Sequence, residues 1–250
     1  MNSMIILGLF LSVVAGAATM LGGGIAFLMK KPSSKILSVS LGFSAGVMIA
    51  VSFLELLPCG IGGVGFLNAN VLFFAGIIFI FILDILVPHE YIAERFSCND
   101  PHLMRIGLFT ALGIAIHNFP EGFAVFSASM HSLHTGVLIA LAIIIHNIPE
   151  GISVSVPVFC ATHSKRKALY YSFLSGMLEP VGALIAAVVL LPFLSQTLIC
   201  SVLAFVAGVM VYISFDELLP AAHRYGHEHM VTGGIIAGMI VMAATLVLLG

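Results

Sequence analysis

The chain of 250 residues is 60% hydrophobic and only 8% charged, and its mean hydropathy is +1.18. A soluble domain of this length has no need of so much apolar surface, so the composition indicates a polytopic membrane protein. The net charge of -2 says nothing about nucleic acid, but the sequence has no basic patch, so no nucleic-acid partner is expected. The lipid bilayer is the partner that the composition predicts.

A membrane-spanning helix needs about 20 apolar residues. On this basis eight spans are predicted in chain order, at 4–29, 36–57, 70–87, 105–129, 133–160, 168–192, 196–220 and 231–249. All nine lysines and arginines fall outside these spans or at their edges, and eight spans place all nine on one side of the membrane. By the positive-inside rule that side is cytoplasmic, so both termini are expected to be extracytoplasmic. We expect an all-α fold in which residues 1–250 form a single transmembrane transporter domain.

An internal repeat links the second span to the seventh. Residues 41–58, LGFSAGVMIAVSFLELLP, recur as 203–220, LAFVAGVMVYISFDELLP, with 12 of 18 positions identical. The two spans cross the membrane in opposite directions, so the repeat is inverted. An axis in the membrane plane would relate the first three spans to the last three and the fourth to the fifth, a 3+2+3 arrangement. Inverted repeats around a midplane site are typical of transporters, although a duplication retained only for packing is the alternative.

The fourth and fifth spans each contain the same six-residue pattern, HNFPEG at 117–122 and HNIPEG at 146–151. Each pattern places an imidazole and a carboxylate four residues apart, on one helix face. A single histidine within a membrane is more often a packing residue, but a duplicated pattern of ionisable residues at the midplane favours a functional site. Two such faces turned toward each other would form a nitrogen- and oxygen-rich pocket suited to a divalent metal ion.

Seven of the 11 acidic residues lie within the predicted spans, where Arg105 at the edge of the fourth span is the only accompanying lysine or arginine. An ionised carboxylate without a partner is strongly disfavoured there, so these acids should be protonated, hydrated or bound to a cation. The candidate metal ligands are His117, Asn118, Glu121, His146, Asn147, Glu150 and Glu179. The candidate pathway residues are Glu55 at an outer mouth, Asp84, Asp216 and Glu217 at an inner mouth, and Met48 and Met210, for which core packing is an equal alternative.

At these residues the chain resembles the ZIP (Zrt-, Irt-like) metal-ion transporters, most closely the short prokaryotic members of the zinc-uptake type. The resemblance covers essentially the whole chain and includes SGMLEP in the sixth span and the AGVM repeat of the second and seventh. It implies a binuclear site between the fourth, fifth and sixth spans. The first metal would use His117, Glu121, His146 and Glu150, and the second Asn118, Asn147, Glu179 and the same two bridging glutamates.

The resemblance has further implications for the pathway and the assembly. Met48 matches a position that touches the first metal, Glu55 matches the entrance, and Asp84, Asp216 and Glu217 match exit-side positions. In the family, spans 1, 4, 5 and 6 slide against spans 2, 3, 7 and 8, and the protein is often a homodimer.

We therefore expect a transporter that moves Zn²⁺, or a related ion such as Fe²⁺, Mn²⁺ or Cd²⁺, into the cytoplasm across a prokaryotic inner membrane. Two ions at the central site would be its cargo, and no resident cofactor is expected. The sequence has no nucleotide-binding loop, so ATP is not the expected driver. The alternatives are an intramembrane metalloenzyme, for which the HExxH motif is missing, and a metal sensor that does not transport.

Overall fold

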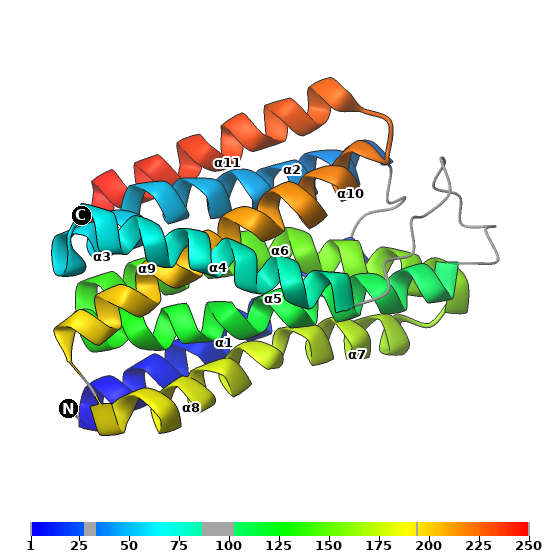
Figure 1. Cartoon of the computed structure of the whole chain (residues 1–250). Coiled ribbons are helices and arrows are strands. Elements are labelled where there is room, and N and C mark those ends of the chain that lie inside the picture. Colours follow the sequence, from blue (N-terminus) through cyan, green and yellow to red (C-terminus); the bar gives the residue numbers. More distant parts are fainter. Residues whose placement is uncertain (1, 28–33, 87–102, 194, 250) are drawn as a thin grey trace.

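The computed structural model describes residues 2–27, 34–86, 103–193 and 195–249 (Figure 1). Regular structure in these ranges is entirely helical, which confirms the predicted all-α fold. The α-helices are α1 (Asn2–Ala26), α2 (Ser34–Val51), α3 (Leu57–Val64), α4 (Phe66–Leu86), α5 (Leu103–His131), α6 (Leu133–Thr162), α7 (Lys165–Gly176), α8 (Leu178–Leu190), α9 (Gln196–Ile213), α10 (Leu219–His223) and α11 (Glu228–Leu249). Short segments of other helix types are η1 (Ser52–Leu56), η2 (Leu191–Phe193) and η3 (Ser214–Leu218).

Within the described residues, 7 helical stretches are long and apolar enough to cross a membrane. The remaining predicted span, the fourth at 105–129, corresponds to α5, a helix of 29 residues that also carries the first HNxPEG motif. This helix packs against α1, α6, α7, α8 and α9, so neighbouring helices rather than lipid surround its polar side chains. The chain is thus an integral membrane protein with several spans, as its composition predicts.

Successive membrane-spanning stretches run in alternate directions, and the N- and C-termini lie at the same end of the molecule (Figure 1). The described basic residues lie at the opposite end, where helices begin after a connection or end before one: Lys35, Arg105, Lys165, Arg166, Lys167 and Arg224. The remaining basic residues, Lys30, Lys31 and Arg95, lie outside the described residues, as do the predicted span ends at 29 and 87. The charge segregation that the sequence predicts therefore holds for the described part of the chain.

The two copies of the 18-residue repeat share an unusual local conformation. In each copy an α-helix passes into a π-helical turn, Ser52–Leu56 or Ser214–Leu218, and then returns to an α-helix with a proline in its first turn. Proline has no N–H and its ring clashes with the carbonyl four residues earlier, so a wider turn lets the helix continue. The serine that begins each wide turn donates to the carbonyl of Met48 or Met210, at 2.7 and 2.8 Å.

These wide turns correct one prediction. The second span was expected to end at residue 57. Instead the helical stretch continues from Ser34 to Val64. The wide turn accommodates Pro58, and the chain reverses at Gly65, whose φ is 81°.

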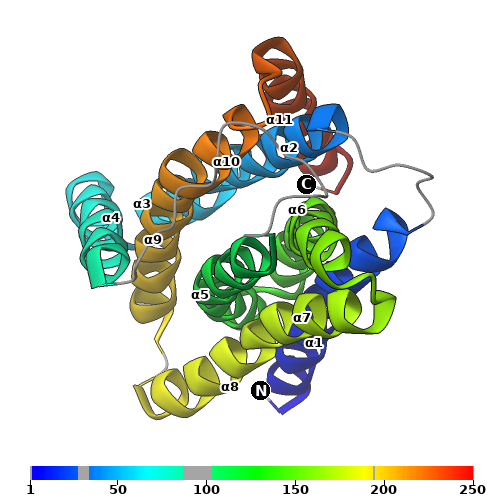
Figure 2. The same cartoon turned by 90° about the vertical axis from the view of Figure 1, so that its right-hand side faces the viewer.

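The helices form two groups (Figure 2). We call α1, α5, α6, α7 and α8 the motif bundle, because it carries both HNxPEG motifs, and α2, α3, α4, α9, α10 and α11 the flanking row. Within the motif bundle α1 packs on α6 as α8 packs on α5, and within the flanking row α2 packs on α11 as α9 packs on α4. The inverted repeat relates the α1–α6 pair to the α8–α5 pair, and the α2–α11 pair to the α9–α4 pair. The groups meet mainly where α2 contacts α6 and where α9 contacts α5.

Glycines bring the paired helices together at equivalent positions. A Cβ added at Gly46 would lie 2.2 Å from the backbone oxygen of Ile235 in α11, and one at Gly208 would lie 1.9 Å from that of Phe73 in α4. In the motif bundle, a Cβ at Gly151 would lie 1.8 Å from the Thr19 oxygen in α1. Because real Cβ atoms do not approach other atoms so closely, the helix backbones can come this near at these positions only because glycine has no side chain.

Candidate metal-binding site

The two HNxPEG motifs meet at the centre of the motif bundle, because α5 and α6 are antiparallel neighbours. The break between α7 and α8 places Glu179 in the first turn of α8, beside them. No member of the predicted ligand set exposes more than 1% of its surface: His117, Asn118, Glu121, His146, Asn147, Glu150 and Glu179. Three carboxylic acids and two imidazoles are therefore buried in one apolar bundle.

His146 and Glu121 link the two motifs directly, with His146 Nε2 2.9 Å from Glu121 Oε1. The other ring nitrogen, Nδ1, lies 3.1 Å from the backbone oxygen of Ala142. A carbonyl oxygen only accepts, so Nδ1 must carry the proton of this hydrogen bond, and the neutral ring then turns a lone pair on Nε2 toward the carboxylate. A proton or a cation between the two atoms removes this conflict, and an imidazole held through a backbone carbonyl is the usual arrangement of a metal-ligating histidine.

His117 occupies the corresponding place on α5 and lies between two carboxylates. Its Nε2 is 3.5 Å from Glu150 Oε2, and its Nδ1 is 3.6 Å from Glu217 Oε2 in the π-helical turn of the flanking row. Donor atoms bound to one tetrahedral zinc ion lie about 3.3 to 3.6 Å apart, given metal–ligand distances of about 2.0 to 2.2 Å. His117 and Glu150 thus stand at a separation that suits two ligands of the same ion.

Both asparagines are held by their amide nitrogen and leave their oxygen unused. Asn118 Nδ2 donates to the backbone oxygen of Ser175 in α7 at 2.9 Å. Asn147 Nδ2 donates to the backbone oxygen of Ala15 in α1 and to Glu179 Oε2, both at 2.9 Å. These bonds fix the orientation of each amide, so each Oδ1 is presented as a neutral oxygen donor.

Six of the seven predicted ligands carry a buried polar atom that has no hydrogen-bond partner among the described residues. These atoms are both ring nitrogens of His117, Asn118 Oδ1, Glu121 Oε2, Asn147 Oδ1, Glu150 Oε2 and Glu179 Oε1. Buried polar atoms are almost always paired, since an unpaired one costs about 1–3 kcal/mol. A group of unpaired oxygen and nitrogen acceptors fits a cation, because a divalent ion satisfies several of them at once.

Ser44 belongs to this site although no pattern in the sequence points to it. Its hydroxyl donates to Glu150 Oε1 at 3.0 Å and also lies 3.3 Å from the backbone oxygen of His146. Ser44 is in α2, so this contact links the flanking row to the motif bundle. A serine in an apolar helix usually bonds to its own backbone, and its role becomes visible only when α2 is packed against α6.

Among the candidate pathway residues, Glu217 contacts the central site through His117. Asp84 accepts a hydrogen bond of 3.2 Å from the Tyr212 hydroxyl, which joins α4 to α9, and Asp216 is exposed. Glu55 is partly buried in η1, the wide turn equivalent to that of Glu217. Met48 and Met210 are buried in the main apolar core, so both the pathway and the packing interpretation of these methionines stay open.

The fold and the site together define a polytopic membrane protein with a buried, metal-type ligand set between antiparallel helices. The sequence pattern of the family described as ZIP zinc transporter matches residues 98–246. The zinc transporter ZupT of Chlorobium phaeovibrioides is 50% identical over 96% of this chain and 97% of the relative. ZupT of Lysinibacillus sphaericus is 48% identical over 100% of both chains, and ZupT of Streptococcus mutans is 46% identical over 95% of this chain and 96% of the relative.

The chain belongs to the ZIP zinc transporter family. This confirms the resemblance that the two HNxPEG motifs and the inverted repeat suggest. The relatives are named as transporters and not as enzymes, so the expectation that this chain is not an enzyme is also confirmed.

Proposed function

We propose that the protein moves divalent transition-metal ions, above all Zn²⁺, across the bacterial inner membrane into the cytoplasm. The group of buried, unpaired acceptor atoms on the HNxPEG motifs is the observation that carries this proposal. The similarity of the chain to bacterial zinc transporters supports zinc over other cargo. The mixture of imidazole and carboxylate donors suits zinc, iron and manganese alike.

The donor set is large enough for two ions. One ion would be held by His117, Glu121, His146 and Glu150, and the other by Asn118, Asn147, Glu179 and the same two bridging glutamates. Two observations support this division: each histidine lies against a carboxylate of the opposite motif, and Asn147 lies against Glu179. The three carboxylates supply the negative charge that replaces the hydration of an ion at the midplane.

Cargo movement would use the division of the fold into two groups. All seven proposed ligands belong to the motif bundle, whereas Ser44 and Glu217 reach them from the flanking row. Sliding of the motif bundle along the flanking row would carry the ions together with their ligands. The contacts that Ser44 and Glu217 make with the site from the flanking row would change during this movement. All spans act as one transporter domain in this proposal, and the assembly is a homodimer.

The decisive test is a flux measurement with purified protein in proteoliposomes. We expect zinc to accumulate inside the vesicles faster than in protein-free vesicles, without ATP. Uptake by the same vesicles from solutions of different divalent ions ranks these ions as cargo. Zinc binding without accumulation would favour a metal sensor and contradict transport.

Membrane orientation can be tested by labelling with an impermeant thiol reagent in intact cells. Asn68 is exposed at the end of the bundle that carries the termini, and His229 is exposed at the basic end. We expect Asn68→Cys to add labelling from outside and His229→Cys to add none, because the basic end should be cytoplasmic. The parent chain gives the background from its native cysteines. Reversed labelling would place the basic end outside the cell and interchange the proposed outer and inner mouths.

Replacement of Glu217 by glutamine tests the contact between the two groups. The change keeps the size of the side chain but removes the charge that faces His117 Nδ1 at 3.6 Å. We expect the initial rate of zinc uptake to fall by roughly tenfold, which corresponds to about 1.4 kcal/mol. Glu228→Gln, at the exposed start of α11, is the control and should be neutral. Equal rates for the two variants would show that Glu217 does not act on the site.

A further inference from the structure

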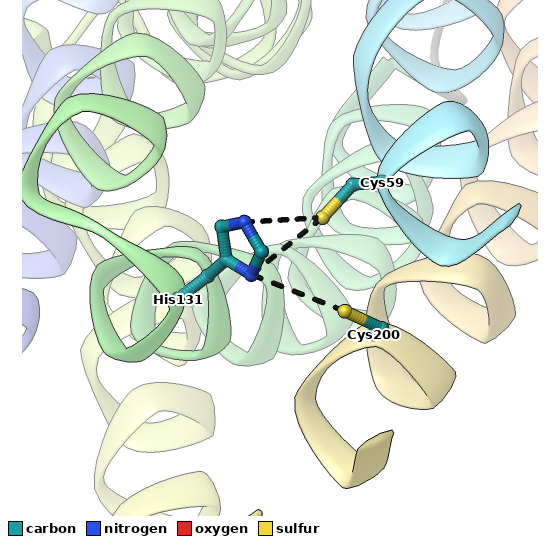
Figure 3. Close-up of side chains that lie close together, drawn as sticks. All are labelled: Cys59, His131 and Cys200. Carbon is teal, nitrogen blue, oxygen red and sulfur yellow. Dashed lines mark hydrogen bonds between the residues drawn. The ribbon is translucent and has the colours of Figure 1, made fainter. Parts of the chain in front are cut away.

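A second group of metal-type side chains comes together from three helices (Figure 3), at the end of the bundle where α3 and the termini lie (Figure 1). Cys59 comes from α3, His131 ends α5, and Cys200 comes from the start of α9. Their ligand atoms all lie within 4.8 Å of one another. We call these residues the cysteine–histidine triad. None of them belongs to the HNxPEG motifs or to the repeat at 41–58 and 203–220.

The triad has the dimensions of a tetrahedral metal site. His131 Nδ1 lies 3.8 Å from Cys59 Sγ and 3.9 Å from Cys200 Sγ. Two ligands of one zinc ion, at about 2.3 Å for sulfur and about 2.0 Å for nitrogen, are separated by about 3.5 to 3.8 Å. For the two pairs of a histidine nitrogen and a cysteine sulfur, an ion could therefore be bound with displacements of only a few tenths of an ångström.

A fourth ligand is available at the same point. The side-chain amide of Gln196 contacts His131 Nδ1 and lies 3.8 Å from Cys200 Sγ. Rotation of this amide by half a turn would place its oxygen, a metal ligand, where its nitrogen lies. A water molecule is the other candidate, since Cys59 and His131 are only partly buried.

The backbone of α3 is shaped around the second cysteine. A Cβ added at Gly63 would lie 2.3 Å from Cys200 Sγ, and one at Gly60 would lie 2.6 Å from Ala204 Cβ. Both glycines therefore allow α3 and α9 to approach until the two thiols face the same imidazole. This close packing fixes the position of Cys200, which is buried, while Cys59 keeps the site open to solvent.

We propose that the triad is a second metal site, for a thiophilic divalent cation such as Zn²⁺ or Cd²⁺. Two thiolates and an imidazole are softer donors than the oxygen-rich central set, so the triad should favour cadmium more strongly. His131 belongs to the motif bundle, whereas both cysteines belong to the flanking row. An ion bound to all three ties the groups together and slows uptake when metal is abundant at this end. Binding stands independently of the proposed transport, while the slowing of uptake rests on it.

Binding is tested by titration of the purified full-length chain with Cd²⁺. Cadmium bound to thiolate absorbs in the ultraviolet, and bound thiols resist alkylation, which peptide mass spectrometry locates. We expect the absorption to appear with protection of both Cys59 and Cys200. His131→Asn should weaken the affinity by roughly tenfold or more, whereas His134→Asn, at an exposed position of the same end, should not.

Two results would overturn the binding site. One is an unchanged cadmium absorption in the double variant Cys59→Ser, Cys200→Ser. The other is a disulfide between Cys59 and Cys200 in the freshly purified protein, since such a pair has no thiolate to offer. Repetition in the Glu121→Ala variant separates the triad from the central site, which contains no thiol.

The slowing of uptake is tested in proteoliposomes over a range of external zinc concentrations. The uptake rate of the native chain should reach a maximum and then decline as external zinc increases. The uptake rate of Cys59→Ser should keep rising to a plateau. An equal decline in both proteins would refute the slowing even if cadmium binds the triad. No uptake by either protein would instead contradict the proposed transport, and with it the slowing, but leave the binding result intact.

Discussion

Replacing Glu121 or Glu150 by alanine should abolish zinc uptake while the protein still reaches the membrane. Each carboxylate faces the histidine of the opposite motif, at 2.9 Å for Glu121 and 3.5 Å for Glu150, and each is proposed to bridge both ions. Its loss removes charge from both positions and leaves the opposing imidazole without its partner. We expect initial rates of zinc and iron uptake to fall more than roughly hundredfold at matched membrane expression.

Glu179 provides the comparison within the site. Its described side-chain bond is the one from Asn147, so Glu179→Ala should spare the first ion. We expect measurable uptake with an altered preference between zinc and iron. Glu121→Gln and Glu150→Gln keep the packing volume and should fail like the alanine variants, which separates a missing ligand from a misfolded protein. Near-normal uptake by Glu121→Ala or Glu150→Ala would remove the central site from the mechanism.

Gly151→Ala should disrupt transport through packing rather than through chemistry. The new Cβ would lie 1.8 Å from the backbone oxygen of Thr19, so α1 and α6 must separate. Overpacking of this kind costs about 1–3 kcal/mol. The separation also moves Glu150, the preceding residue, and Asn147, which bonds to α1 through Ala15. We expect loss of most uptake together with a lower midpoint of thermal unfolding in detergent.

The matched control for this substitution is Gly233→Ala. Gly233 lies inside α11, and an added Cβ there meets nothing within 4 Å. Alanine is favoured over glycine in a helix by about 1 kcal/mol, so this variant should be as stable as the parent or more stable, with unchanged uptake. Gly122→Ala, whose Cβ would lie 1.9 Å from the backbone oxygen of Glu179, should behave like Gly151→Ala. Normal uptake by both motif variants would mean that the crossings tolerate wider spacing.

Much of the architecture could be predicted because the sequence repeats itself. Helix number follows from hydropathy, and the convergence of the two motifs follows from a duplicated pattern on antiparallel neighbours. Ser44 could not be predicted, because a small polar residue in an apolar helix has the same appearance whether it bonds to its own backbone or to a neighbouring carboxylate. Glu217 was assigned to an inner mouth from its place near the end of a span, and its contact with His117 depends on how α9 crosses α5.

The cysteine–histidine triad shows a different limit of sequence reasoning. Its residues are separated by more than 60 positions and come from three helices, so no spacing pattern connects them. Each alone is unremarkable: an isolated cysteine or a loop histidine is usually a packing or solvated residue. Only the close approach of α3 to α9, which depends on two glycines, brings the sulfur atoms to one imidazole.

The wide turns at Ser52–Leu56 and Ser214–Leu218 also decide which neighbours each span can pack against. A wide turn holds one residue more than an ordinary turn, and each residue rotates the helix face by about 100°. The part of a helix that follows it therefore presents its side chains in a new direction, which allows α2 to pack on α11 while α3, in the same span, packs on α9 and α4. Because both copies have this extra residue at the same position, each half of the chain turns one span toward two different partners in the same way.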